Sequence, residues 1–259
     1  MANAPRMKNQ YFGDKRDFIK YSLIADVLKH HPELSTFAFI PMLTKDDSTN
    51  EGNVRKYRCE SRDEGVHKFL LENQKNKSIK LWRGFFGNKY PDRSYMVGNL
   101  DETPAQNSKA QYFEHYKRQD YFAGITKWKT NSALVFIDAD IGIQPVNNRT
   151  WGRIINKPEK AEKYILRSEI ELLANHISDS VLMIYQHLQN DKRKHKDQAE
   201  EKLTVLSGFF GGNASSVRCN DVQYLFASRD SSHQRAINVT LERHASTNKM
   251  TFEHKLATP

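Results

Sequence analysis

The hydrophobic pattern of the chain alternates between short apolar runs and stripes at helical spacing. Residues 134–137 and 181–185 are unbroken apolar runs, which are typical of strands buried on both faces of a sheet, and residues 36–43, TFAFIPML, also indicate a strand. Apolar side chains recur every three or four positions at residues 18–28 and 166–177, which predicts a helix in each place. The alternation of strands and helices indicates an α/β protein.

The C-terminal part of the chain has a different pattern. Residues 215–219 and 222–227 are strand-like segments separated by Asn220 and Asp221, and this spacing predicts a β-hairpin. We expect a further strand at residues 235–243.

Domain organisation follows from these elements. Residues 248–259 are poor in apolar side chains and are expected to form a frayed tail. We therefore predict a single Rossmann-like α/β domain over residues 1–247, with a mostly parallel sheet, a C-terminal antiparallel hairpin and long loops.

One aromatic stretch has two interpretations. Residues 83–94, RGFFGNKYPDRS, follow a predicted strand at residues 79–82 and indicate a loop because they are rich in Gly, Asn and Pro. Phe85, Phe86 and Tyr90 stand among basic residues there, so they would stack on nucleic-acid bases if exposed. The alternative is that these rings belong to the core.

The charge balance favours a polyanionic partner. Lys and Arg number 40 against 31 Asp and Glu, which gives a net charge of +9 and a pI near 9.4. Nucleic acid, RNA or DNA, is the first candidate. Because the charges are spread along the chain, an ordinary basic enzyme is the alternative.

The cysteine count and the lengths of the apolar runs indicate the cellular compartment of the protein. Cys59 and Cys219 are the only cysteines, without a CxxC pair or a Cys/His cluster, so we expect neither a disulfide framework nor a zinc site. No apolar run approaches the ~20 residues of a membrane span, and the opening MANAPRMKNQ lacks the apolar core of a signal peptide. We expect a cytoplasmic protein without membrane contact; the oligomeric state is left open.

Candidate chemistry gathers at the predicted strand ends. The strand at residues 134–137 runs directly into Asp138 and Asp140, and His187 follows the strand at residues 181–185. Ligands of open α/β sheets bind at the carboxyl ends of the strands, so these side chains are candidate catalytic residues. Turn capping by the two acids and a structural role for His187 are the alternatives.

Two further groups are candidates for cofactor binding. Asp46 and Asp47 lie in the polar loop TKDDSTNEGN after the first strand, where they are either site carboxylates or solvated loop acids. Asp14 and Asp17 fall at the start of the first helix, followed by Lys20. Helix capping and an i,i+3 ion pair would explain these three residues in purely structural terms.

A long segment after the central strand is a candidate binding loop. Residues 143–159 show little periodicity, and loops of this length in compact domains are usually lids or binding loops. Arg149 and Arg153 would contact phosphate, and Trp151 would stack on a base. The alternative is a disordered insertion.

The first of two resemblances concerns enzymes. The chain is similar to class I SAM-dependent methyltransferases in having strands and helices followed by a terminal hairpin. Its start resembles the GNxxDxxKH motif of large-subunit rRNA adenine-N6 methyltransferases, matched by Gly13, Asp14, Asp17, Lys20 and Tyr21. The resemblance implies that Lys20 helps to hold the SAM carboxylate. It also implies that Asp138, in the position of the family's DPPY aspartate, is catalytic.

The second resemblance covers more of the chain and supplies no chemistry. A family of uncharacterised bacterial proteins carries YFGDxxDxxKY, FDPDxG and YQH motifs. Residues 11–21, 136–142 and 185–187 resemble them.

Departures from the methyltransferase pattern leave other functions open. The glycine-rich loop is missing after Leu43, and DADI replaces DPPY. The carboxylates at positions 46, 47, 138 and 140 would instead suit Mg²⁺ or Mn²⁺ in a metal-dependent nuclease or phosphodiesterase. A non-catalytic nucleic-acid-binding module is the third possibility.

Overall fold

The computed structural model describes most of the chain, namely residues 15–42, 44, 63–73, 81–98, 113–128, 132–177, 179–188 and 194–255. Gly13, Asp14, Asp46 and Asp47, all predicted cofactor-binding residues, lie outside the described residues.

The described strands and helices alternate along the chain. The strands are β1 (Thr36–Met42), β2 (Ser94–Val97), β3 (Ala133–Ala139), β4 (Gly142–Ile143), β5 (Tyr164–Ile165), β6 (Val181–His187), β7 (Ala214–Cys219), β8 (Val222–Ala227) and β9 (Thr251–Lys255). The helices are α1 (Lys15–His30), α2 (Glu64–Glu72), α3 (Leu81–Lys89), α4 (Arg118–Ile125), α5 (Asn148–Ile155), α6 (Pro158–Ala161), α7 (Arg167–His176), α8 (His195–Phe209) and α9 (Ser231–Thr247), with a 3₁₀ turn at His115–Lys117.

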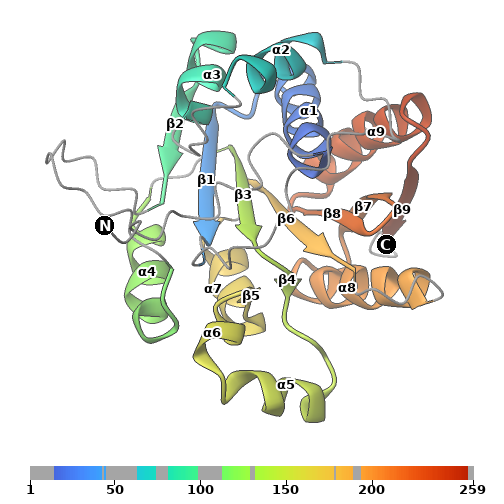
Figure 1. Cartoon of the computed structure of the whole chain (residues 1–259). Helices are drawn as coiled ribbons and strands as arrows, with labels where there is room; N and C mark the ends of the chain where they lie inside the picture. Colours follow the sequence, from blue (N-terminus) through green and yellow to red (C-terminus); the bar gives the residue numbers. More distant parts are fainter. Residues whose placement is uncertain are drawn as a thin grey trace, which may run out of the picture.

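A central sheet organises the fold (Figure 1). Within the described residues, seven strands form it in the order β2-β1-β3-β6-β8-β7-β9, and β4 and β5 pair separately. β2, β1, β3 and β6 run parallel, whereas β8 is antiparallel to both β6 and β7, and β9 is antiparallel to β7. The predicted mixed α/β, Rossmann-like fold with a C-terminal antiparallel strand pair is confirmed.

Alternation along the strands divides the core into two halves. On β1, Phe37 and Phe39 pack into one half, while Ala38 and Ile40 pack into the other, because successive strand side chains point to opposite faces. α1, α2, α3 and α9 cover the first face, and α4, α7 and α8 cover the second. The result is a three-layer sandwich in which α1 packs over β1, β3 and β6.

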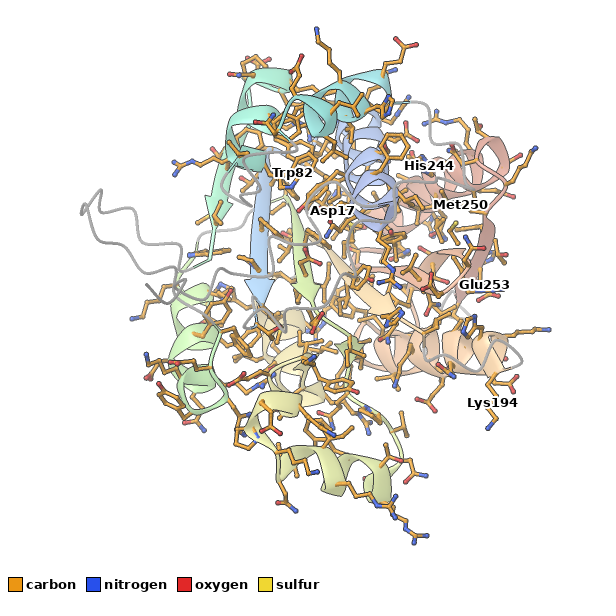
Figure 2. All side chains as sticks on the ribbon, in the orientation of Figure 1. Asp17, Trp82, Lys194, His244, Met250 and Glu253 are labelled. Carbon is orange, nitrogen blue, oxygen red and sulfur yellow. The ribbon has the colours of Figure 1, made fainter. Side chains whose placement is uncertain are left out.

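Residues 81–89 form helix α3, so the strand predicted at residues 79–82 is wrong at residues 81 and 82, while residues 79 and 80 lie outside the described residues. The predicted loop at residues 83–94 is wrong for residues 83–89, whereas residues 90–93 do form a turn. Trp82 and Phe86 lie one helical turn apart on α3 and are both buried. Trp82 stacks on Tyr21 of α1, with ring centroids 3.4 Å apart, and lies among the side chains between α3 and the sheet (Figure 2). This packing overrides the glycines of the segment, and Phe85 also packs against the core.

The predicted strand at residues 235–243 is part of helix α9. The carboxylate of Asp230 caps this helix by accepting from the backbone amides of Ser232 and His233. The frayed tail expected over residues 248–259 is wrong for residues 251–255, which form β9 and pair with β7, and residues 256–259 lie outside the described residues.

Cys219 corrects the expectation about thiols. It is disulfide-bonded in the structure, and Cys59, the other cysteine of the sequence, lies outside the described residues. Two isolated cysteines have no spacing that would indicate such a bond. In the described ranges, no helix has the length and apolar character needed to cross a membrane.

Candidate functional site

Three parallel strands end side by side at one end of the sheet. Pro41 of β1 lies opposite Asp138 of β3, and Ile137 of β3 lies opposite Ile184 of β6. The carboxyl ends of the three strands are therefore adjacent.

Strand alternation decides which of these side chains face α1. Phe136 belongs to the core half beneath α1, so Asp138, two positions further on, points to the same face. Tyr185 belongs to that half as well, which directs His187 to this face. The two predicted site residues thus share one face and one end of the sheet.

Lys20 joins the first helix to the central strand. Its Nζ lies 2.8 Å from the Oδ2 of Asp138 and 2.8 Å from the Oδ1 of Asp17, one turn earlier on α1. The Lys20 side chain is 7% exposed and that of Asp138 is 18% exposed. We call Asp17, Lys20 and Asp138 the lysine cluster. Asp17 does form the i,i+3 pair that the sequence allowed, but Lys20 also bridges to the sheet.

Aromatic rings surround the ammonium group of the lysine cluster. Its Nζ lies 4.9 Å from the ring centre of Tyr21, 5.6 Å from that of Tyr185 and 5.8 Å from that of Phe136. These rings restrict water around Lys20 and attract its positive charge through their π faces. The cluster is consequently a charged group set in apolar surroundings.

The pKa values of Asp138 and Lys20 are shifted because two carboxylates and one ammonium are buried together. Burial raises the pKa of Asp138 above its usual value, and the charge of Asp17 adds to this while Lys20 opposes it. Burial alone would lower the pKa of Lys20, but Asp138 and Asp17 outweigh it and hold the pKa well above its ordinary value. The neighbouring carboxylates therefore favour the charged form of Lys20, and Asp138 takes up a proton more readily than a free aspartate.

Asp140 has separate partners. Its Oδ2 lies 3.4 Å from the Nζ of Lys163, and the hydroxyl of Thr44 donates to it at 3.4 Å. Burial raises the pKa of Tyr164, and the charge of Asp140 contributes to the rise. Asp140 is close enough to Asp138 to raise its pKa slightly, so the two predicted carboxylates belong to one electrostatic site.

His187 lies in a second charged group, formed with Arg16 and Asp221. The Nη2 of Arg16 donates to the Oδ2 of Asp221 at 2.5 Å. The Nε2 of His187 lies 3.2 Å from this Nη2 and 3.4 Å from the same Oδ2. Burial would raise the pKa of Asp221, but the contacts of His187 and Arg16 outweigh it and hold the pKa far below its usual value. Arg16 and Asp221 were not predicted as site residues, because a hairpin aspartate and a helix arginine have ordinary structural explanations.

Gln186 of β6 binds the backbone of the bend that follows β3. Its side-chain amide donates to the carbonyl of Ile141 at 3.0 Å, and its Oε1 accepts from the amide of Ile143 at 2.8 Å. Gly142 between them has φ +112, and a Cβ there would lie 2.5 Å from that Oε1. The bend after Asp138 and Asp140 is therefore fixed against β6 and requires glycine.

The predicted binding loop at residues 143–159 is instead largely helical, which corrects the expectation of an irregular loop or insertion. The side chain of Asn147 caps α5 by accepting from the amides of Arg149 and Thr150. Trp151 packs edge-on against Tyr164, with ring centroids 5.9 Å apart, whereas Arg149 and Arg153 are exposed one turn apart. α5 lies beyond the carboxyl ends of the strands (Figure 1).

The carboxylates considered for metal binding are only partly described, because Asp46 and Asp47 lie outside the described residues. Among the described residues, no group of three or more His, Cys, Asp or Glu side chains is arranged to hold a metal ion. Asp138 and Asp140 each face a lysine ammonium, which competes with a cation for the carboxylate oxygens.

Comparisons of the chain with protein families, with curated proteins and with solved structures found no match.

Proposed function

We propose that this protein transfers a methyl group from SAM to an amino group of a nucleic-acid base. The observation that carries the proposal is the 2.8 Å contact between Lys20 and Asp138. The resemblance to adenine-N6 methyltransferases assigns these two residues to cofactor binding and catalysis, and they meet at the carboxyl end of the sheet, where α/β folds bind their ligands. The C-terminal antiparallel strands agree with the same resemblance.

The charges of the lysine cluster fit the amino-acid end of SAM. An ammonium has three donors, and the two carboxylates of the cluster accept from two of them, which leaves one for the carboxylate of a ligand. Asp17 offers an acceptor for the ligand's α-amino group. With two carboxylates and one ammonium, the cluster carries an excess of negative charge, which complements the net positive charge of SAM. When bound, SAM would supply an electrophilic methyl group.

Asp138 is the residue that would act on the base. Its carboxylate stands at the strand end, and its raised pKa brings it nearer to the range useful for a proton acceptor. In this role it accepts a hydrogen bond from the exocyclic amine and orients the nitrogen lone pair toward the methyl group. The DADI sequence offers no ring to stack on the base, so the partner aromatic would come from elsewhere in the chain.

Nucleic acid fits the charge of the chain as substrate. The net charge is +9, and Arg149 and Arg153 extend a basic surface along α5 beyond the strand ends. RNA and DNA share the phosphate chemistry that these arginines would contact.

Calorimetric titration with SAM tests the cofactor. We expect binding to the wild type, a loss of at least roughly tenfold in Lys20→Met, where a charge-assisted hydrogen bond is removed, and wild-type affinity in Lys89→Met. Lys89 is the matched control, because this lysine is also ion-paired to an aspartate. Its partner is Asp63, at the start of α2 and away from the lysine cluster. A wild type that does not bind SAM overturns the proposal.

Transfer of labelled methyl groups to total RNA and to denatured DNA tests the reaction. Asp138→Asn should bind SAM and lose transfer, because the amide is a weaker proton acceptor. A parallel titration with Mn²⁺ examines the metal-dependent nuclease. If Mn²⁺ binds the wild type but not Asp138→Asn, and SAM does not bind, the nuclease alternative is favoured. If neither Mn²⁺ nor SAM binds the wild type, a non-catalytic binding module is favoured.

A further inference from the structure

Tyr116 carries an exposed aromatic ring in the short 3₁₀ turn before α4. It is 75% exposed, and within the described residues it is the only aromatic one among the exposed large apolar side chains. Its hydroxyl donates to the Oε2 of Glu114 at 2.6 Å. The Nζ of Lys117 lies 2.9 Å from the same oxygen and 5.4 Å from the centre of the ring. These contacts orient the ring and leave most of its surface accessible to a ligand.

The turn that carries Tyr116 lies beside the carboxyl ends of the strands. In the first turn of α4, Tyr121 donates its hydroxyl to the carbonyl of Pro41, near the end of β1, at 2.7 Å. The backbone amide of His115 donates to Glu162, just after α6, at 3.1 Å. Figure 1 shows α4, α5 and α6 beyond the carboxyl ends of β1 and β3. The ring therefore belongs to the same end of the molecule as the lysine cluster.

Exposed cations cover the neighbouring helices α5 and α6. Residues 147–163 hold five basic side chains against two acidic ones. Four of the five are exposed and lie in no ion pair with the residues that the structure describes, namely Arg149, Arg153, Lys157 and Lys160. We call these four residues the α5–α6 cations. Their unbalanced charge attracts a polyanion.

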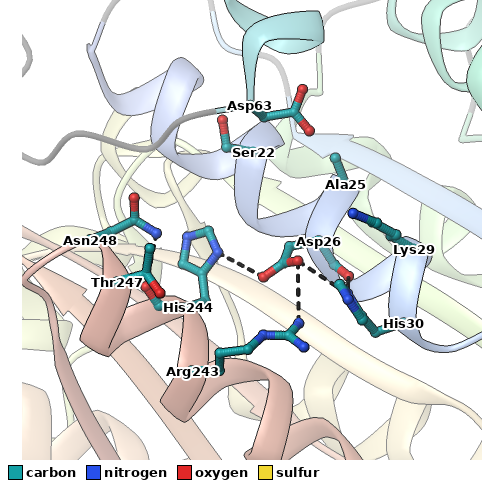
Figure 3. A pocket seen from close by; sticks show the side chains of 10 residues that line it. All are labelled: Ser22, Ala25, Asp26, Lys29, His30, Asp63, Arg243, His244, Thr247 and Asn248. Carbon is teal, nitrogen blue, oxygen red and sulfur yellow. Dashed lines mark hydrogen bonds and ion pairs between the residues drawn. The ribbon is translucent and has the colours of Figure 1, made fainter.

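The basic side chains between α1 and α9 show the contrasting arrangement. In the pocket between these helices, one carboxylate, that of Asp26, faces three basic side chains (Figure 3). Its oxygens lie 3.0 Å from the Nδ1 of His244, 3.1 Å from the Nδ1 of His30 and 3.4 Å from the Nη2 of Arg243. The charge of Arg243 is thus balanced within the fold, whereas the α5–α6 cations remain available to phosphate.

The exposed ring favours a single strand over a duplex. A base can stack on Tyr116 only if the face of that base is accessible, and in a duplex neighbouring bases cover these faces. Phosphate contacts alone would not distinguish the two forms, because both carry the same backbone. An unpaired base also suits the proposed reaction, since enzymes that modify bases act on single strands or extrude the base from the duplex.

We propose that Tyr116 and the α5–α6 cations form one binding surface for single-stranded nucleic acid. Tyr116 stacks on a base, and the cations contact phosphates. The inference rests on the proposed function in that it names the form of its substrate. Binding is measured without SAM, however, so the surface and the methyl-transfer reaction can fail separately.

Fluorescence anisotropy of the full chain with a labelled RNA of mixed sequence tests the surface, as a single strand and as the corresponding duplex. We expect the single strand to bind at least roughly tenfold more tightly, which is the contribution of one stacked base. Tyr116→Ala should weaken single-strand binding by roughly tenfold and leave duplex binding unchanged. Tyr116→Phe should bind like wild type, because it keeps the ring. Lys160→Gln should weaken binding of both forms, because it removes a phosphate contact.

Val239→Ala is the matched control. Val239 is 68% exposed on α9, away from this surface, and its replacement should change neither affinity. Since all four variants alter exposed side chains, their thermal unfolding should match that of wild type.

Three results would each overturn the proposal. They are equal affinity for single strand and duplex, wild-type single-strand affinity in Tyr116→Ala, and a loss in Tyr116→Phe as large as that in Tyr116→Ala. Absence of RNA binding at low salt would overturn it as well. Absence of methyl transfer with these affinities intact would overturn the proposed function and leave the surface supported.

Discussion

Lys20 of α1 and Asp138 at the end of β3 lie 2.8 Å apart, although 118 positions separate them in the sequence. Both side chains are largely buried, so the pair is shielded from water and salt. Such a pair costs free energy to desolvate, and it is retained more easily where it serves a ligand than where it only supports the fold. This contact joins α1 to the end of β3.

Breaking this pair should destabilise the protein. Lys20→Met leaves two carboxylates without their ammonium, and we expect the free energy of unfolding to fall by about 3 kcal/mol, as for other broken buried pairs. Urea unfolding followed by circular dichroism measures the change. In Lys20→Met combined with Asp138→Asn, the loss should be smaller than the sum of the single losses, because one uncompensated charge has been removed.

An exposed pair provides the comparison. Lys68 and Glu72 on α2 are 78% and 60% exposed, with their charged atoms 3.9 Å apart. Lys68→Met should change the free energy of unfolding by less than about 0.5 kcal/mol. Equal effects at positions 20 and 68 would show that the lysine cluster is solvated in solution.

The bend between β3 and β4 offers a second test. Gly142 has φ +112, and a Cβ there would lie 2.5 Å from the side chain of Gln186 and 2.8 Å from the carbonyl of Tyr185. Gly142→Ala should therefore lower the free energy of unfolding by roughly 2 kcal/mol or more, through backbone strain and displacement of Gln186.

Gly152 is the matched control for that substitution. It lies within α5, and a Cβ there would meet nothing within 4 Å. Gly152→Ala should raise the free energy of unfolding by about 0.5–1 kcal/mol, because alanine is the better helix former. Similar signs for the two variants would contradict the assigned role of Gly142.

The elements with strong periodicity could be predicted from the sequence, and with them the main site. The runs that became β1, β3 and β6 are mainly apolar, and their parallel pairing brings the strand ends that carry Asp138 and His187 together. The ion pair of Asp138 with Lys20 did not follow from spacing, because it depends on how α1 packs across the sheet. Arg16 and Asp221 are separated by 205 positions and escaped prediction for the same reason.

The errors have a common physical cause, which is that tertiary packing chose between two local patterns. In residues 235–243, Ile237, Val239 and Leu241 alternate as in a strand, yet the cap at Asp230 starts a helix whose buried face is Ile237, Leu241 and Ala245. Val239 is left 68% exposed as a result.

Acid should weaken the second charged group. The pKa of Asp221 is lower in the folded protein than in the unfolded chain, so between these two pKa values the unfolded state binds more protons. The stabilisation by Asp221 is therefore complete above about pH 4, the ordinary aspartate value, and is lost as the pH falls further. Asp221→Asn should lower the free energy of unfolding by about 2 kcal/mol at pH 7.

Urea unfolding at pH 7 and pH 3 measures this effect. The difference between wild type and Asp221→Asn should shrink at pH 3. Asp92→Asn, at an exposed turn position, serves as the control and should show little difference from wild type at either pH. A difference at position 221 that is independent of pH would mean that the ion pair with Arg16 does not form.

Arg149 and Arg153 are exposed one turn apart on α5. If Arg149 and Arg153 on α5 contact phosphates, affinity for single-stranded RNA or DNA should fall steeply with salt, and each Arg→Gln change should reduce the slope of log K against log salt by about 1. Arg235→Gln on α9 is the control and should leave the slope unchanged. Fluorescence anisotropy with labelled oligonucleotides at several salt concentrations gives these slopes. Because both arginines are exposed and only their backbone supports the helix, the variants should unfold like wild type, so a changed slope reports binding and not folding. If the slope is unchanged when Arg149 and Arg153 are both replaced by Gln, α5 does not contact the nucleic acid. The salt dependence would then come from positive charges elsewhere on the chain.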